Sequence, residues 1–496
     1  MRLLNKNKEI LVLFLVALAL RMFLALTARG IATDGCSYAL LAKEIASGNF
    51  REVFSSILPP LFPAFAAGAS YIFRDFELSG RIVSCLFGSL AVFPLFFLAK
   101  NIFDKKIALI TVLFFVVHPY LSQVSGEVLT EALYCFLVTS IASLSWIAIQ
   151  RRKMALFLVV GLLLSLAFLT RFEGFFLIFP VLGWIWLTNL LEIRTEIKWK
   201  FISSFSCLVM FIIPLSPYLF FVHQETGKWQ LTTRQQQYED AYFKSSTDER
   251  TPLQVTGSLL KFKIVQNIPQ IPFCVAKAYY PAFLLPLFFG LVRRKRIKEF
   301  KVGEAYILSF ILIRITELII FAGIIVRYFY AFVPMALCWA GTGFWEIDYR
   351  LQEKYKDKNL CIGEDGISRY SVMILVVIMA VCLPIGLRPI EGHRAIQKEV
   401  GFWLRQNAGK KDFVIVASSP QESFYAGAKW QELKGSDYSD IINNARKTET
   451  DFVIVDKKTD DRHPDFRKSI KPEDLEVFTR KFEDSSRKIV IYKLKK

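Results

Sequence analysis

The stretch Ile31-Ala-Thr-Asp-Gly-Cys-Ser-Tyr-Ala-Leu-Leu-Ala-Lys-Glu-Ile-Ala-Ser-Gly-Asn-Phe50 directly follows the first strongly apolar segment of the chain. It places an acid, Asp34, where that segment should leave a bilayer. Apolar side chains then recur at helical spacing, which predicts a short amphipathic helix over residues 37–48. A carboxylate at a membrane surface, followed by a helix able to lie in that surface, is suited to chemistry on a lipid-borne substrate.

The composition of the chain indicates a polytopic α-helical membrane protein. The 496 residues are 53% hydrophobic with a mean hydropathy of +0.37, too apolar for a soluble protein of this size. Apolar stretches of about 20 residues, each long enough to cross the hydrocarbon, recur along the sequence. The net charge of +18 lies largely in short clusters between these stretches, which argues against a nucleic-acid partner.

We expect about eleven transmembrane helices that alternate in direction from an N-terminus inside the cell. Their ranges are 9–28, 79–101, 107–122, 128–149, 154–170, 174–192, 200–222, 271–291, 303–325, 328–346 and 370–388. This arrangement puts basic clusters such as Arg151–Lys153 inside, as the positive-inside rule requires. The short apolar segment 59–73 would reverse every later cluster if it crossed, so we expect a re-entrant or interfacial helix in the outer loop that holds Asp34.

The chain changes character after a membrane domain over residues 1–392. Three short apolar runs, Phe413–Ala417, Phe452–Asp456 and Ile489–Leu494, predict buried strands. Together with helical segments between them, they indicate a small extracytoplasmic α/β domain over residues 393–496. Most of the eight cysteines lie inside apolar segments, and the sequence contains neither a disulfide framework nor a CxxC metal motif.

Five groups of polar residues face the outside in this topology, at the ends of helices that lie far apart in the sequence. They are Asp34, Glu127 with Glu131, Arg171 with Glu173, Arg327 with Tyr328, and His223 at the start of a long outer loop over 223–270. Ionisable residues near membrane depth are costly and usually functional. Carboxylates can act as a general base or bind a cation, and arginines can donate hydrogen bonds to a phosphate.

Each of these residues also has a purely structural interpretation. Asp34 can cap the helix that follows it, and Glu131 suits the positive end of a helix dipole. Arg171 and Arg327 can extend to lipid headgroups. His223 is interpreted as a loop residue, and Arg314 with Glu317, inside the ninth span, as a buried pair or a helix bend.

The order of several short patterns resembles the GT-C superfamily of lipid-linked sugar transferases. More narrowly, it resembles glycosyltransferase family 39, the protein O-mannosyltransferases and aminoarabinose transferases, in their bacterial members. The patterns are Asp34, Tyr38-x-x-x-Ala42-x-x-Ile45-x-x-Gly48, Pro59-Pro60-Leu61-Phe62-Pro63, Ser79-Gly-Arg-Ile-Val-Ser84, Thr130-Glu131, Leu169-Thr-Arg171, Arg327-Tyr328, Trp403-Leu404 and Tyr425-Ala-Gly427. The last two resemble the outer domain that many bacterial members carry.

The resemblance implies an inverting transferase that moves a sugar from a polyprenyl (undecaprenyl or dolichyl) phosphate to an acceptor protein, lipid or glycan. The protein would be a multi-pass protein of the bacterial inner membrane, surrounded by lipids, with its active site and C-terminal domain facing the periplasm or exterior. By analogy, Asp34 is the base that deprotonates the acceptor, Glu131 supports the first loop or binds a cation, and Arg327 holds the leaving phosphate. The further substrate-binding candidates are Tyr38, Glu127, Arg171, Glu173 and Tyr328.

Two departures from the family bear on a metal site. The aminoarabinose-transferase branch has an acid and a lysine before the double proline, where this chain has Ile57 and Leu58. The protein mannosyltransferases have two adjacent acids in the first loop, whereas Gly35 follows Asp34 here. We therefore expect no required cofactor and no metal ligands, with a divalent cation as an alternative that the sequence does not support.

Two other functions would share much of this pattern. A transporter or flippase of lipid-linked glycans would place polar groups at mid-membrane in several helices, but mid-span charge is nearly absent here outside Arg314 and Glu317. A polymerase or ligase of surface glycans would share the long outer loop but would not explain the first one.

Overall fold

The computed structural model describes residues 8–191, 193, 195–231, 265–292, 298–321, 324–355, 361–362, 367–388, 393–410, 412–435, 437–484 and 487–495. The predicted outer loop 223–270 therefore lies largely outside the described residues. The chain divides into two compact units. One comprises Met1–Leu26 with Tyr38–Arg388, and the other comprises Thr27–Ser37 with Pro389–Lys496.

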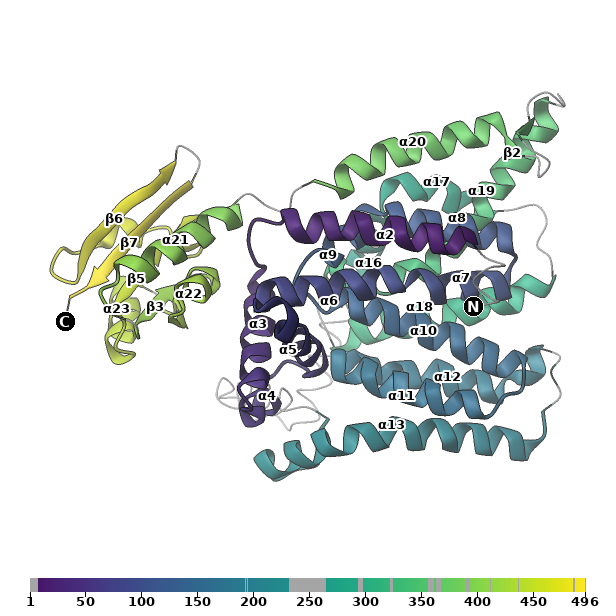
Figure 1. The fold of residues 1–496 in the computed structure, drawn as a ribbon, viewed down its shortest axis with the longest axis horizontal. Helices are drawn as coiled ribbons and strands as arrows, with labels where there is room; N and C mark the ends of the chain where they lie inside the picture. Colours follow the sequence, from purple (N-terminus) through teal and green to yellow (C-terminus); the bar gives the residue numbers. More distant parts are fainter. Residues whose placement is uncertain are drawn as a thin grey trace. The chain divides into compact units, whose positions relative to one another are not determined.

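The first unit is a bundle of long helices (Figure 1). In chain order its helices are α2 (Lys8–Thr27), α3 (Thr33–Ala46), α4 (Phe50–Ser55), α5 (Leu61–Phe73), α6 (Phe76–Leu90), α7 (Val92–Ile102), α8 (Lys105–Val117), α9 (Pro119–Ser125), α10 (Glu131–Gln150), α11 (Ala155–Thr170), η1 (Phe172–Leu177), α12 (Ile178–Trp186), η2 (Thr188–Leu191), α13 (Ile197–Thr226), η3 (Ile268–Gln270), α16 (Ile271–Tyr279), α17 (Pro281–Leu291), α18 (Lys298–Phe321), η4 (Val326–Phe329), α19 (Val333–Tyr355) and α20 (Arg369–Gly386). Two antiparallel strands of two residues each, β1 (Cys361–Ile362) and β2 (Ile367–Ser368), lie between α19 and α20 in the sequence.

The helices of this unit have the length and composition of membrane spans. Among the described residues, five helical segments can cross a membrane, and seven if each bent pair, α8 with α9 and Val265–Tyr279 with α17, forms one span. Shorter apolar helices cover Leu61–Phe73, Ala155–Thr170 and Phe172–Trp186. The predicted class, a multi-pass helical membrane protein with a small C-terminal α/β domain, is confirmed. Each expected span contains helix, but the number of eleven stays a prediction.

The predicted first outer loop is more helical than its sequence pattern indicates. Helix α3 begins at Thr33, so Asp34 lies inside its first turn instead of ahead of the helix. The predicted stripe is buried at Tyr38, Leu41 and Ala42. The segment after the double proline is indeed a helix, α5, and its placement as re-entrant or interfacial stays a prediction. In Figure 1, α3 and α4 run across one end of the long helices.

Close helix packing in the bundle depends on small residues. At Gly290 of α17, a Cβ atom would collide with the carbonyl oxygen of Trp339, and at Gly343 of α19 it would collide with that of Pro286. The two helices thus approach each other through reciprocal glycines, which is how helices gain packing contacts when lipid supplies no hydrophobic driving force between them.

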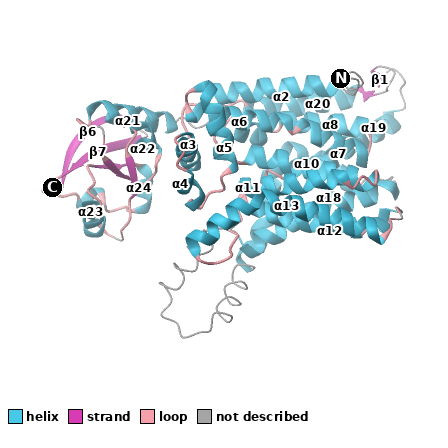
Figure 2. Ribbon diagram, turned by 60° about the horizontal axis from the view of Figure 1, so that its bottom comes forward, coloured by secondary structure: helices cyan, strands magenta, loops and turns pink. Residues whose placement is uncertain are grey.

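The second unit contains a five-stranded sheet and all the described strands except β1 and β2 (Figure 2). The strand order is β4-β3-β5-β7-β6, with β3 parallel to β4 and β5, and with β7 antiparallel to β5 and β6. The elements are α21 (His393–Asn407), β3 (Val414–Ala417), α22 (Gln421–Ala426), β4 (Lys429–Glu432), α23 (Tyr438–Lys447), β5 (Phe452–Val455), α24 (Lys457–Arg462), η6 (Arg467–Ser469), β6 (Leu475–Asp484) and β7 (Arg487–Leu494).

The core of this unit follows from alternation along the central strands. Ile415, Ile454 and Ile491 face α21, whereas Val416, Val453 and Val455 belong to the hydrophobic cluster that includes α23. The three predicted strands β3, β5 and β7 are present. The sequence pattern does not predict strands β4 and β6. The four residues of β4 are all exposed, so this strand has no run of apolar residues.

Candidate active site

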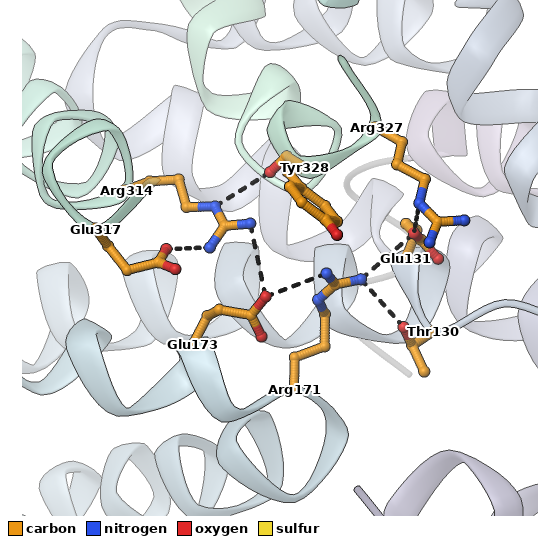
Figure 3. A network of polar contacts seen from close by, with 8 residues as sticks. All are labelled: Thr130, Glu131, Arg171, Glu173, Arg314, Glu317, Arg327 and Tyr328. Carbon is orange, nitrogen blue, oxygen red and sulfur yellow. Dashed lines mark hydrogen bonds and ion pairs between the residues drawn. The ribbon is translucent and has the colours of Figure 1, made fainter. Parts of the chain in front are cut away.

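Charged side chains from four parts of the chain meet in one polar network (Figure 3). Glu131 is the first residue of α10, Arg171 directly follows α11, and Glu173 lies in η1. Arg327 and Tyr328 lie in η4. Because each of these positions is a helix end, its side chain can reach over the neighbouring helix end. The sequence prediction that these residues converge on one side is consistent with this geometry.

Glu131 connects two arginines. Its Oε1 atom lies 3.3 Å from Nη1 of Arg171 and 3.5 Å from Nε of Arg327. The same Arg171 nitrogen donates to Oγ1 of Thr130 at 3.3 Å. Among the described residues, the second carboxylate oxygen of Glu131 is buried without a hydrogen-bond partner. Burial of a carboxylate oxygen without a hydrogen bond costs free energy. The attraction between Glu131 and its two arginines offsets this cost.

Arg171 extends the network to the next acid. Its Nη2 atom lies 3.2 Å from Oε1 of Glu173. Its guanidinium also lies 5.8 Å from the ring centroid of Tyr134 and 5.4 Å from that of Tyr328. These cation–π contacts and two ion pairs fix the orientation of the Arg171 side chain.

Arg314 and Glu317, in the last two turns of α18, complete the network. They form the buried pair that their spacing predicts. The structure adds that this pair is not isolated, because Arg314 donates from Nε to the carbonyl oxygen of Tyr328 at 3.1 Å and lies 3.9 Å from Glu173. An arginine and a glutamate three residues apart in an apolar helix are the sequence signal for this part of the network.

The exposure of the network's arginines increases from α18 to η4. The side chains of Arg314 and Glu317 are each 3% exposed, that of Arg171 is 13% exposed, and that of Arg327 is 37% exposed. The drawn network contains three carboxylates and three guanidiniums, so its buried charges are balanced as burial requires. Arg327 is thus the cation of the network that a ligand phosphate can reach most readily.

Two further candidates lie within electrostatic reach of this network. Tyr38 of α3 interacts with the charge of Arg171, and its ring packs edge-on against Phe62 at 5.4 Å. The charge of Glu127 interacts electrostatically with the hydroxyl of Tyr330. The charges of Glu131 and Arg327, which belong to the network, interact with the same hydroxyl.

Asp34 and His223 are not among the residues of the network that Figure 3 draws. Asp34 belongs to the other compact unit, so its approach to the network stays a prediction. The prediction that His223 is a loop residue was wrong. His223 lies in the last turn of α13 and stacks on Trp229, with ring centroids 4.2 Å apart.

Within the described ranges, no group of three or more His, Cys, Asp or Glu residues could hold a metal ion. The carboxylates of Glu131, Glu173 and Glu317 are each paired with an arginine.

Comparisons with known proteins bear on the class of this protein. The family model for dolichyl-phosphate-mannose-protein mannosyltransferases matches residues 58–218, which contain Glu131, Arg171 and Glu173. A search of curated protein sequences returned no significant match.

Solved structures resemble the chain over nearly all its length. The structure of ArnT from Cupriavidus metallidurans in the apo state matches with 12% identity over 99% of this chain and 98% of that chain, with a TM-score of 0.63. ArnT bound to undecaprenyl phosphate matches with 13% identity over 98% of each chain and a TM-score of 0.61. The apo oligosaccharyltransferase of Archaeoglobus fulgidus matches with 12% identity over 90% of this chain and 69% of that chain, with a TM-score of 0.59.

The chain thus has the fold of ArnT and of the Archaeoglobus oligosaccharyltransferase, and about a third of it matches the model for dolichyl-phosphate-mannose-protein mannosyltransferases. The resemblance found in the sequence is thereby confirmed.

Proposed function

We propose that this protein is a glycosyltransferase that moves a sugar from a polyprenyl phosphate to an acceptor hydroxyl, with inversion, on the outer face of the bacterial inner membrane. The observation that carries the proposal is the position of Arg327. It is the most exposed arginine of a buried, charge-balanced network at the helix ends. A guanidinium in this setting can form two parallel hydrogen bonds to a phosphate. ArnT and the Archaeoglobus oligosaccharyltransferase, which share the fold, have been solved with undecaprenyl phosphate and dolichol-phosphate, respectively.

The reaction requires a base and a site for the leaving group. Asp34 takes the proton of the acceptor hydroxyl, whose oxygen forms a bond to the anomeric carbon of the sugar. The bond between that carbon and the phosphate oxygen breaks, and the polyprenyl phosphate leaves with the bonding electron pair. Arg327 donates hydrogen bonds to the oxygens on which negative charge increases, which lowers the barrier.

The remaining residues hold Arg327 and shape the site. Glu131 contacts both Arg171 and Arg327 and so orients the guanidinium that receives the phosphate. Tyr38, Glu127, Arg171, Glu173 and Tyr328 are the substrate-binding candidates around it. The acceptor is a protein, lipid or glycan that carries a hydroxyl group.

The charge pattern supports an outer location for this site. Glu131 begins α10, and the basic cluster Arg151–Lys153 follows its other end. The 20 residues of α10 separate the two by roughly 30 Å, which is the thickness of the hydrocarbon layer. Since basic clusters stay on the cytoplasmic side, the network faces the periplasm or exterior. The same topology puts the C-terminal unit outside.

The test uses purified full-length protein in lipid nanodiscs with a panel of polyprenyl-phosphate sugars and hydroxyl acceptors. Wild type should transfer one of these sugars, and Asp34→Asn should lose at least about 100-fold in kcat, the scale of general base catalysis. Arg327→Met should raise the KM for the donor and lower kcat, and Arg327→Lys should recover part of the loss because it keeps the charge.

Three outcomes would contradict parts of this proposal. Unchanged turnover of Asp34→Asn would exclude this residue as the base. Movement of labelled lipid across vesicles without sugar transfer would favour a flippase. Turnover that is lost on treatment with EDTA and restored by a divalent cation would require a metal that we have not assigned.

A further inference from the structure

The C-terminal unit includes the segment that leads into α3. Residues Thr27–Ser37 group with Pro389–Lys496, although nearly the whole membrane unit separates them in the sequence. The backbone N–H of Ile31 donates to the hydroxyl of Tyr425 at 2.8 Å. The amide nitrogen of Gln421 donates to Oγ1 of Thr33 at 2.9 Å. Both partners belong to α22 (Gln421–Ala426).

Burial makes these contacts effective restraints. Ile31 is 1% exposed, so its N–H would be costly to leave without a partner. Gln421 is also buried. Gly30 packs so closely on α21 that a Cβ atom there would lie 2.6 Å from both Cβ and the carbonyl oxygen of Arg394. The chain therefore follows the surface of α21 and α22 until α3 begins at Thr33.

The Tyr425 side chain is itself held in place. Its ring lies 5.5 Å from that of Phe402, and the ammonium of Lys398 lies 5.0 Å from its centroid. Helix α21 also packs tightly on α22, because a Cβ atom at Gly401 would lie 2.5 Å from that of Tyr425. The hydroxyl that receives the Ile31 N–H is thus carried by a fixed ring.

We propose that the C-terminal unit positions Asp34 for catalysis, with Tyr425 and Gln421 as its positioning residues. This inference rests on the proposed function, in which Asp34 is the base. Ile31 is three residues before Asp34 and Thr33 directly precedes it, so the two hydrogen bonds fix the backbone from which the carboxylate projects. A base that moves by about 1 Å can lose about 100-fold in rate.

The main test compares Tyr425→Phe with Tyr438→Phe in the full chain. The hydroxyl of Tyr438 accepts the backbone N–H of Lys471 at 3.1 Å and donates to Asp474 at 3.1 Å in the same unit, so Tyr438→Phe loses at least as many hydrogen bonds away from Asp34. Hydrogen exchange of the peptide that covers residues 27–37 should accelerate in Tyr425→Phe only. The same variant should lose about 10-fold in kcat with an unchanged KM for the donor, because substrate binding does not use Tyr425.

Two further variants test the same restraint in other ways. Gln421→Leu removes the contact with Thr33 and should lower kcat by a similar factor. Gly30→Ala should separate the segment from α21 and lower kcat further. Its matched control is Gly68→Ala in α5, because no heavy atom lies within 4 Å of a Cβ built at Gly68.

The outcomes separate this inference from the proposed function. If Tyr425→Phe exchanges faster over residues 27–37 but keeps its kcat while Asp34→Asn is inactive, the positioning role is wrong and the base is right. An unchanged exchange rate would also overturn the positioning role. If Asp34→Asn is fully active, the proposed function fails in its base, and the inference fails with it. If a variant misfolds, exchange in β3 and β5 will rise as well, and the remaining variants then decide.

Discussion

Glu131 and Arg171 lie 40 positions apart in the sequence and form a 3.3 Å contact where α10 begins and α11 ends. The contact joins two helix ends and gives the network its central carboxylate. Because a second arginine, Arg327, lies 3.5 Å from the same oxygen, Glu131 balances more positive charge than one ion pair would require. Its removal should therefore affect both the stability and the activity of the protein.

We predict that Glu131→Gln lowers the free energy of unfolding by about 3 kcal/mol, because it leaves buried guanidinium charge without compensation. It should also lower kcat at least about 10-fold, since Arg327 loses its orienting partner. Chemical unfolding in detergent and a transfer assay measure the two effects. The control is Glu9→Gln, which breaks the exposed pair with Lys105 and should cost no more than about 1 kcal/mol. Equal losses in both variants would contradict the prediction.

The glycine contact between α17 and α19 leads to a second prediction. Gly343→Ala places a methyl group against the carbonyl oxygen of Pro286 and should destabilise the protein by about 2 kcal/mol. Gly183→Ala in α12 adds the same methyl group where no heavy atom lies within 4 Å. It should be neutral or slightly stabilising, because alanine favours helix more than glycine does. Thermal unfolding of the two variants in the same detergent gives the comparison, and a lower midpoint for Gly183→Ala would contradict it.

Arg21 in α2 leads to a third prediction. The side chain is fully buried, and in the described part of the chain its Nε and Nη2 atoms have no hydrogen-bond partner. The side chain makes a 3.3 Å hydrogen bond to the carbonyl oxygen of Ala17 and a cation–π contact of 5.0 Å with Phe115. Because an uncompensated buried charge is costly, Arg21→Met should raise the free energy of unfolding by about 1 kcal/mol or more.

The matched control for Arg21 is another buried arginine that has partners. Arg81 pairs with Glu77 and donates to the carbonyl oxygen of Ala25 at 3.2 Å. Arg81→Met should therefore destabilise the protein, because it leaves Glu77 without this partner in a buried position. Chemical unfolding of both variants tests the contrast. Destabilisation by Arg21→Met would show that its charge has a partner or ligand in the native membrane protein.

A fourth prediction concerns pH. Burial raises the pKa of Glu422 in α22 from 4.5 to about 8, with a smaller contribution from the charge of Asp456, while Gln397 and Lys458 act in the opposite direction. Between these two pH values the unfolded chain loses a proton that the folded chain keeps. The carboxyl group therefore contributes its full stability below about pH 4.5, and the free energy of unfolding falls by up to about 1.4 kcal/mol per pH unit until about pH 8.

Glu422→Gln removes this titration while it preserves the shape of the side chain. As the pH rises from 5 to 8, the β3 and β5 amides of wild type should lose protection from hydrogen exchange relative to those of Glu422→Gln. The difference should level off above that range. A difference that is independent of pH would exclude Glu422 as the titrating group.

Local patterns in the sequence determined the class of protein and most of its elements. A long apolar run forms helix in lipid because all its backbone groups are then paired within the segment. Short apolar runs bounded by polar residues predicted β3, β5 and β7, because apolar side chains are buried in the core of a domain. The positive charge between spans indicated which helix ends share one side. These features depend on residues that are close in the chain, so they are visible without a structure.

Contacts between distant residues were decided only by the tertiary structure. The pattern of α18 predicted that Arg314 meets Glu317, but not that the pair reaches Glu173 and Tyr328. Ile31 and Tyr425 are 394 positions apart, and neither shows a local preference for the other. Such pairings arise because whole elements pack to bury apolar area, and the hydrogen bonds then form between the groups that packing brings together. The sequence by itself thus identified the helix ends where charge collects, and the fold decided which charges meet there.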